Sequence, residues 1–147
     1  MTDDSWTIQG RRAEAGLEPV RCLLGDWVGE GQCHGEQVTG RMRGVSVIDG
    51  SWLEVEEILS RMDGAVVHTD RSLYRFNAES EALEAIQLFE RGSMTTSLVE
   101  ATDDGFRWVT GPGAPQLRFS VGVQSLRYTV ILPGEDAPAA EMTYKRA

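Results

Sequence analysis

The side chains able to carry acid–base or metal chemistry are few in this sequence. The only histidines are His34 and His68. His68 lies two residues before Asp70, so both would share one face of a strand, but no Gly-x-Ser-x-Gly nucleophile motif accompanies them. Cys33 beside His34 resembles half of a metal site, yet zinc needs three or four converging ligands, and no further close Cys, nor a His at helical spacing, is present. We therefore predict neither a catalytic site nor a metal site.

Carboxylates and thiols give no stronger signal. Glu54, Glu56 and Glu57 could act as paired carboxylates, but charged residues on a strand more often form its solvated face. Cys22 and Cys33 are the only cysteines. A disulfide between them is conceivable, but reduced thiols fit a cytoplasmic protein better. Nothing in their sequence context indicates a lowered pKa of either thiol.

The secondary-structure elements that would position these side chains begin with a short helix and a strand around Gly25. The segment 19–24 predicts one short helical turn, which starts at a proline and stops at Gly25. Alternation follows, and it places Trp27, Gly29 and Gly31 on one face of a first strand. Two glycines beside a tryptophan indicate that something bulky approaches the backbone there, either another part of the chain or a ligand.

Turn signals recur along the rest of the chain and separate segments rich in β-branched and aromatic residues. Asp49-Gly50 and Asp63-Gly64 are strong hairpin signals, because the turns they favour need positive φ. The predicted strands after the first one are Val38 to Ile48, Trp52 to Met62, Val66 to Phe76, Leu83 to Glu90, Met94 to Glu100, Phe106 to Thr110, Leu117 to Val121, Ser125 to Leu132 and Ala139 to Arg146.

About ten short-linked strands predict an all-β fold, an antiparallel up-and-down β-barrel with a short N-terminal capping helix. A twisted meander of this many strands is more stable closed than as an open sheet, and closure at this strand number leaves room for a ligand. A two-sheet sandwich with a filled core is the alternative fold. Residues 1–16 read as a lead-in, with Trp6 and Ile8 as a possible anchor, and 17–147 as a single barrel domain.

The first strand also carries a resemblance. Gly25-x-Trp27-x-Gly29-x-Gly31 has every fixed residue of the G-x-W-x-G-x-G signature of the nitrobindin family, just after a short helix. The stretch from Met142 to Arg146 resembles that family's last strand, so the resemblance runs from about residue 17 to 145. It implies a ten-stranded barrel, distantly similar to fatty-acid-binding proteins and lipocalins (the calycins).

The same resemblance implies haem b, held by a histidine just before or within the last strand, with nitric oxide and peroxynitrite chemistry. No histidine follows His68, so the implied iron ligand is missing. Met142, Tyr144 or His68 would have to replace it. We therefore expect no cofactor, and haem is the alternative.

A fatty-acid site is a second implication of the calycin resemblance. The Arg-x-Tyr pair that holds a carboxylate in fatty-acid-binding proteins is absent here, since Arg127 and Tyr128 are adjacent and face opposite ways. Arg71, Arg75, Arg118 or Arg127 could still point inward. The sequence does not choose among them.

The face of each strand that points inward is also left open by alternation. On the third strand, one face carries Trp52 and Glu54, and the other carries Leu53 and Glu57. Residues of aromatic, flexible or polar type are candidates to touch a guest in the chamber, although they could equally fill a core. The predicted ligand-binding residues are Trp27, Gly29, Gly31, Trp52, His68, Tyr128 and Met142.

Composition limits the partners. The net charge of −9 argues against nucleic acid or an anionic membrane surface. No signal peptide or membrane-spanning run is visible, so we expect a cytoplasmic protein. The expected function is non-catalytic binding of a small apolar or amphipathic molecule. The alternatives are a haem protein with a replaced axial ligand and a structural barrel with a filled core.

Overall fold

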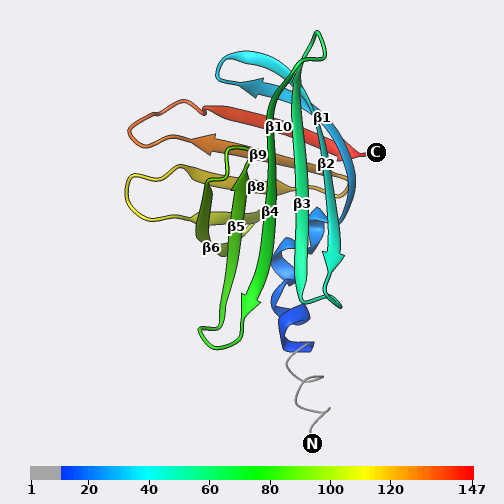
Figure 1. Ribbon diagram of the computed structural model, residues 1–147, viewed down its shortest axis with the longest axis vertical. Coiled ribbons are helices and arrows are strands. Elements are labelled where there is room, and N and C mark those ends of the chain that lie inside the picture. The colour runs from blue at the N-terminus through cyan, green and yellow to red at the C-terminus, as the bar shows by residue number, and fades with distance from the viewer. Residues whose placement is uncertain (1–10) are drawn as a thin grey trace, which may run out of the picture.

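A computed structural model describes residues 11–147, which form one closed barrel of ten antiparallel strands (Figure 1). Each strand pairs with its neighbours in the chain, and the first strand pairs with the last. The predicted barrel is therefore confirmed, and the alternative of a two-sheet sandwich with a filled core is wrong. The strands are β1 (Gly25–Cys33), β2 (Glu36–Val47), β3 (Trp52–Arg61), β4 (Val66–Asn77), β5 (Ala82–Phe89), β6 (Met94–Thr102), β7 (Gly105–Val109), β8 (Gln116–Val121), β9 (Ser125–Ile131) and β10 (Ala140–Arg146).

The strand boundaries lie where the turn residues predict them. Every predicted strand agrees with the observed one to within two residues at each end. At the β2–β3 hairpin, Asp49 and Gly50 have φ of 53° and 83°. A glycine meets this requirement without strain, so the Asp-Gly pair sets the position of the turn.

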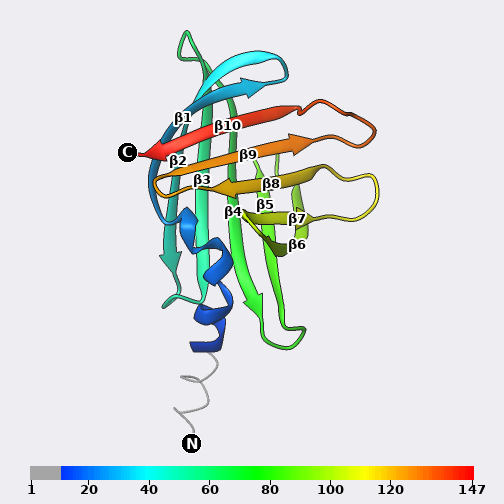
Figure 2. The same cartoon turned by 180° about the vertical axis from the view of Figure 1, so that it is seen from behind.

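A short 3₁₀ helix, η1 (Glu18–Leu23), closes one end of the barrel. It is the predicted helical turn, and Gly25 follows it with φ of 109°. Val20 and Leu23 are fully buried, and the indole Nε1 of Trp27 donates to the Leu23 carbonyl at 3.2 Å. Residues 11–16 form a preceding helical turn. Figure 2 shows this helical segment at the end of the barrel where the β2–β3 and β4–β5 turns lie.

The N-terminal lead-in is only partly described. Its proposed anchors, Trp6 and Ile8, lie outside the described residues. Within residues 11–147, no helix has both the length and the apolar character that a bilayer span requires.

The interior face of each strand is now fixed. On β3 it carries Leu53, Val55, Glu57 and Leu59, which are all buried. An aromatic row fills part of the interior: Tyr74 meets Phe106 edge-on, Phe106 stacks on Phe119 at 4.4 Å between ring centroids, and Phe119 contacts Tyr128. Another part of the interior is not filled by side chains and forms the cavity described next.

Candidate functional site

A cavity of about 510 Å³ occupies the barrel interior. Its inner end reaches Leu23 of η1 and Trp108 of β7. Its outer end is bordered by Thr110 and Pro115 from the β7–β8 loop and by Leu132 from the β9–β10 loop. Since η1 closes the opposite end, these loops form the mouth. The volume and the largely apolar lining are typical of small-molecule pockets.

One carboxylate, that of Glu57, stands on the otherwise apolar inner face of β3. Its side chain is buried and accepts two hydrogen bonds, from the Tyr128 hydroxyl at 2.9 Å and the Tyr144 hydroxyl at 2.6 Å. Burial, and then the nearby charge of Asp70, raise the pKa of Glu57 to about 7. The two tyrosine hydrogen bonds act in the opposite direction because they stabilise the ionised form.

The tyrosine partners remain proton donors. Burial first, and then the charge of Glu57, raise the pKa of both Tyr128 and Tyr144 above that of an exposed tyrosine. Their hydroxyls are therefore neutral at any physiological pH. Their hydrogen bonds fix the orientation of the Glu57 carboxylate and link strands β9 and β10 to β3 across the barrel interior.

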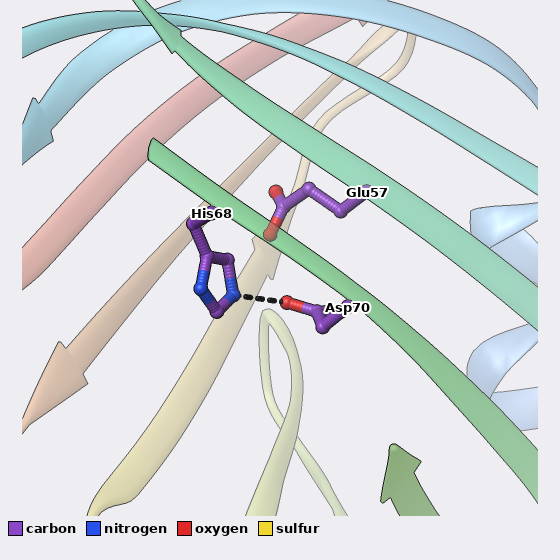
Figure 3. Close-up of side chains that lie close together, drawn as sticks. All are labelled: Glu57, His68 and Asp70. Atoms are coloured by element: carbon purple, nitrogen blue, oxygen red, sulfur yellow. Dashed lines mark hydrogen bonds and ion pairs between the residues drawn. The ribbon is translucent and has the colours of Figure 1, made fainter. Parts of the chain in front are cut away.

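Asp70 and His68 lie on β4 beside Glu57. Asp70 is the cross-strand partner of Glu57, and His68 lies two residues earlier on the same inward face. His68 Nε2 is 2.6 Å from Asp70 Oδ2, and their side chains are 33% and 8% exposed. The hydrogen bond to Asp70 raises the pKa of His68, although burial opposes this. Figure 3 shows Glu57 reaching from β3 toward these two residues.

No arginine or lysine of residues 11–147 lines this cavity. The arginines considered for a fatty-acid carboxylate instead form ion pairs on the outer face: Arg71 with Glu54 and Glu56, Arg75 with Glu84, Arg118 with Asp104, and Arg127 with Glu141. The cavity wall therefore carries the carboxylates of Glu57 and Asp70 beside the imidazole of His68, and His34 is a second histidine in the lining. Such a wall is poorly suited to an anionic head group.

Ser97 on β6 is a second polar feature of the wall. Its side chain lines the cavity and is only 3% exposed. Among residues 11–147, its Oγ has no hydrogen-bond partner. A buried hydroxyl without a partner costs free energy, so a polar group of a guest would satisfy it.

Two of the predicted ligand-binding residues, His68 and Tyr128, line the cavity. The two tryptophans do not. Trp27 is buried next to η1, with its ring under the Arg146 guanidinium at 4.2 Å. Trp52 lies on the outer face of β3, where Arg75 covers its ring. Trp52 was therefore wrong as a cavity-lining candidate, because the inner face of β3 is the one that carries Glu57.

The glycine face of β1 is covered by the chain itself. A side chain at Gly29 would come within 2.8 Å of the Tyr144 ring, and one at Gly31 within 2.8 Å of Met142 Sδ. The bulky group foreseen against this face is therefore strand β10, and neither glycine borders the cavity. Met142 is fully buried in the same contact, so it packs in the wall and does not face a guest.

Glu57, Asp70 and Ser97 were missed as site residues. A signal for Glu57 existed, because it is the only charged residue among Leu53, Val55 and Leu59 on one face of a strand. No local signal existed for Ser97. Its role depends on which groups surround it in the closed barrel.

Neither thiol shows signs of reactivity. Cys22 and Cys33 are both free, and burial raises the pKa of each. Raised thiol pKa values disfavour a nucleophilic thiolate.

The last strand does not fit a haem with its ligand at the implied position. Its cavity-lining residues are Ala139, just before it, and Ala140, neither of which can ligate iron. Met142 packs against Gly31 and Tyr144 donates to Glu57, so both are engaged within the wall. His68 remains the one inward imidazole of β4, and it already contacts Asp70.

The chain matches none of the protein-family models and none of the curated proteins with which it was compared.

Proposed function

We propose that the barrel binds a small, mostly apolar molecule with a polar end inside its cavity, without catalysing a reaction. The observation that carries this proposal is the cavity of about 510 Å³, closed at one end by η1 and walled by apolar and aromatic side chains. The nitrobindin-like first strand supports the same interpretation, since that resemblance implies a ligand chamber.

The polar groups of the wall suggest what the polar end of the guest is like. Glu57 and Asp70 offer acceptors, and Ser97 Oγ lacks a partner within residues 11–147. A neutral or positively charged end with hydrogen-bond donors satisfies these groups. A carboxylate end would instead be repelled by the carboxylates of Glu57 and Asp70. An alcohol, amide or amine end is therefore favoured.

The proposal is tested with the uncharged fluorescent probe N-phenyl-1-naphthylamine. We expect the wild type to take up the probe saturably at one site per chain. Val130 lines the cavity, so Val130→Trp should fill part of the space and lower this uptake. Val28→Trp is the matched control, because Val28 is 44% exposed on the outside of β1. Organic extraction of the purified protein followed by mass spectrometry would identify a natural guest.

Two outcomes would contradict the proposal. The first is a wild-type protein without saturable uptake of the probe, which would favour a barrel that only provides structure. The second is equal uptake by the Val130→Trp and Val28→Trp proteins, which would place the probe outside the cavity. A stoichiometric Soret band that survives dialysis would support haem as the guest.

A further inference from the structure

Glu57, His68 and Asp70 form a compact set of metal-ligand atoms on the wall of the cavity. One ligand atom from each residue lies within 4.8 Å of those of the other two. Two of the residues are on β4 at positions i and i+2, and the third is directly across on β3, so all three point inward from two rigid, paired strands (Figure 3).

The two carboxylates are an unusual pair to bury. Glu57 and Asp70 are cross-strand partners on the same inner face, where like charges destabilise a sheet. No lysine or arginine of the described chain lines the cavity, and the imidazole of His68 can offset one of the two charges. A further positive charge beside the two carboxylates would therefore be stabilised.

The donors suit a transition-metal ion. One imidazole nitrogen and two carboxylates are ligands that Zn²⁺ and its first-row neighbours accept. Three protein ligands on a cavity wall leave the remaining coordination positions open toward the cavity. The hydroxyls of Tyr128 and Tyr144 donate to the two oxygens of the Glu57 carboxylate and so orient it, as outer hydrogen bonds commonly do for metal ligands.

We propose that Glu57, His68 and Asp70 bind one divalent transition-metal ion, of which Zn²⁺ and Co²⁺ are representatives. On binding, His68 Nε2 and Asp70 Oδ2 exchange their mutual contact for bonds to the ion, and Glu57 completes the set. This site revises the expectation of no metal, which rested on the cysteines and on histidine spacing along the chain. It goes beyond the proposed binding of an apolar guest and does not depend on it.

The test uses untagged protein freed of metal with EDTA and then dialysed. Co²⁺ is titrated and followed by its visible d–d absorption, which reports on the coordination shell. We expect one ion per chain for the wild type. Glu57→Gln and His68→Ala should each weaken Co²⁺ binding by at least about tenfold, since each loses a ligand. Glu56→Gln is the matched control, because Glu56 lies next in sequence but pairs with Arg71 outside the barrel.

Two further measurements keep the result decisive. Near-ultraviolet circular dichroism and uptake of N-phenyl-1-naphthylamine show whether each variant still has a folded cavity. If Glu57→Gln fails to fold, His68→Ala decides alone, since His68 is partly exposed at the cavity. Failure of probe uptake with intact Co²⁺ binding would count against the proposed function and leave the metal site standing.

Three results would overturn the metal site. One is the absence of stoichiometric Co²⁺ binding by the wild type. Another is equal binding by the folded Glu57→Gln and His68→Ala proteins. The third is loss of binding in His34→Ala while His68→Ala retains it, because His34 also lines the cavity and the ion would then sit at His34 and not between β3 and β4.

Discussion

Glu57 is the one charged residue on the buried inner face of β3. Its carboxylate is reached by the hydroxyls of Tyr128 and Tyr144 and faces Asp70 and His68. The energy of a buried carboxyl group that accepts from two hydroxyls and lies near another carboxylate depends strongly on whether it is protonated. The free energy of unfolding should therefore depend on pH through this residue.

We expect the wild-type protein in EDTA to lose stability as the pH rises from about 4.5 to about 7. The pKa of Glu57 rises from 4.5 in the unfolded chain to about 7 in the fold, so the folded state binds the proton more tightly, and raising the pH removes that advantage. The loss from this residue is on the order of 3 kcal/mol. The raised pKa of His68 acts with the same sign at higher pH.

Urea unfolding at several pH values measures this effect. Glu57→Gln should flatten the slope between pH 4.5 and 7, because it removes the titrating carboxyl, whereas Glu56→Gln should keep it. A wild-type stability that rises over this interval would show that Glu57 is ionised in the fold at acidic pH.

The alternation of β3 could not by itself identify Glu57 as an interior residue. Both faces of the strand contain carboxylates, and only the closed barrel shows which face is inside. His68 was identifiable because a histidine within a predicted strand is rare in this chain. Its neighbour in space, Glu57, lies eleven positions away along the sequence, and pairing across a hairpin depends on register.

Among the elements, β1 and β2 carry glycines that are covered by the side chains of Tyr144 and Met142 from β10. Gly29 pairs with Gly40 across β1 and β2 and with Tyr144 on β10. A side chain at Gly40 would collide with the Tyr144 hydroxyl. The glycines thus let the Tyr144 ring cross two strands and reach Glu57 on a third.

We expect Gly40→Ala to destabilise the barrel by about 1–3 kcal/mol, since an added methyl group overpacks this contact. The matched control is Gly111→Ala, because a side chain there meets nothing within 4 Å. In a Tyr144→Phe background the cost of Gly40→Ala should be smaller, since the colliding hydroxyl is gone. Urea unfolding of the wild type, Gly40→Ala, Tyr144→Phe and the double mutant gives the coupling energy between the two positions. Strictly additive costs of the two substitutions would contradict this account.

The two tryptophans on β1 and β3 provide a comparison of inner and outer positions. We expect Trp27→Ala to cost about 3–5 kcal/mol, because Trp27 is 3% exposed and holds η1 through the Leu23 carbonyl. Trp52→Ala should cost about 1 kcal/mol, since its main partner is a surface arginine. Thermal and urea unfolding measure both, and equal costs would show that η1 is not held by Trp27.

The positions of the strands could be predicted almost completely from the sequence, because each is bounded by local turn chemistry such as Asp49-Gly50. The identity of the group that covers Gly29 and Gly31 could not. That group, Tyr144 with Met142, comes from the far end of the chain, so no local pattern distinguishes it from a ligand.

At the scale of the whole molecule, the charge of the cavity should decide which guests enter. In metal-free buffer we expect dodecanol to displace N-phenyl-1-naphthylamine at a concentration at least about tenfold below that of dodecanoate, a difference of about 1.4 kcal/mol. The reason is that no arginine or lysine of the described residues lines the cavity. Fluorescence displacement measures both affinities, and tighter binding of dodecanoate would mean that a positive group reaches the cavity.

The pairing of β1 with β10 also dictates an order of events during folding. Trp27 lies opposite Arg146, and Gly29 opposite Tyr144, so the seam of the barrel joins residues separated by most of the sequence. Closing such a long loop is slow compared with forming hairpins. During synthesis on a ribosome, one edge of β1 therefore stays unpaired until the last strand emerges. Over the same period, Glu57 lacks the hydrogen bond from the Tyr144 hydroxyl.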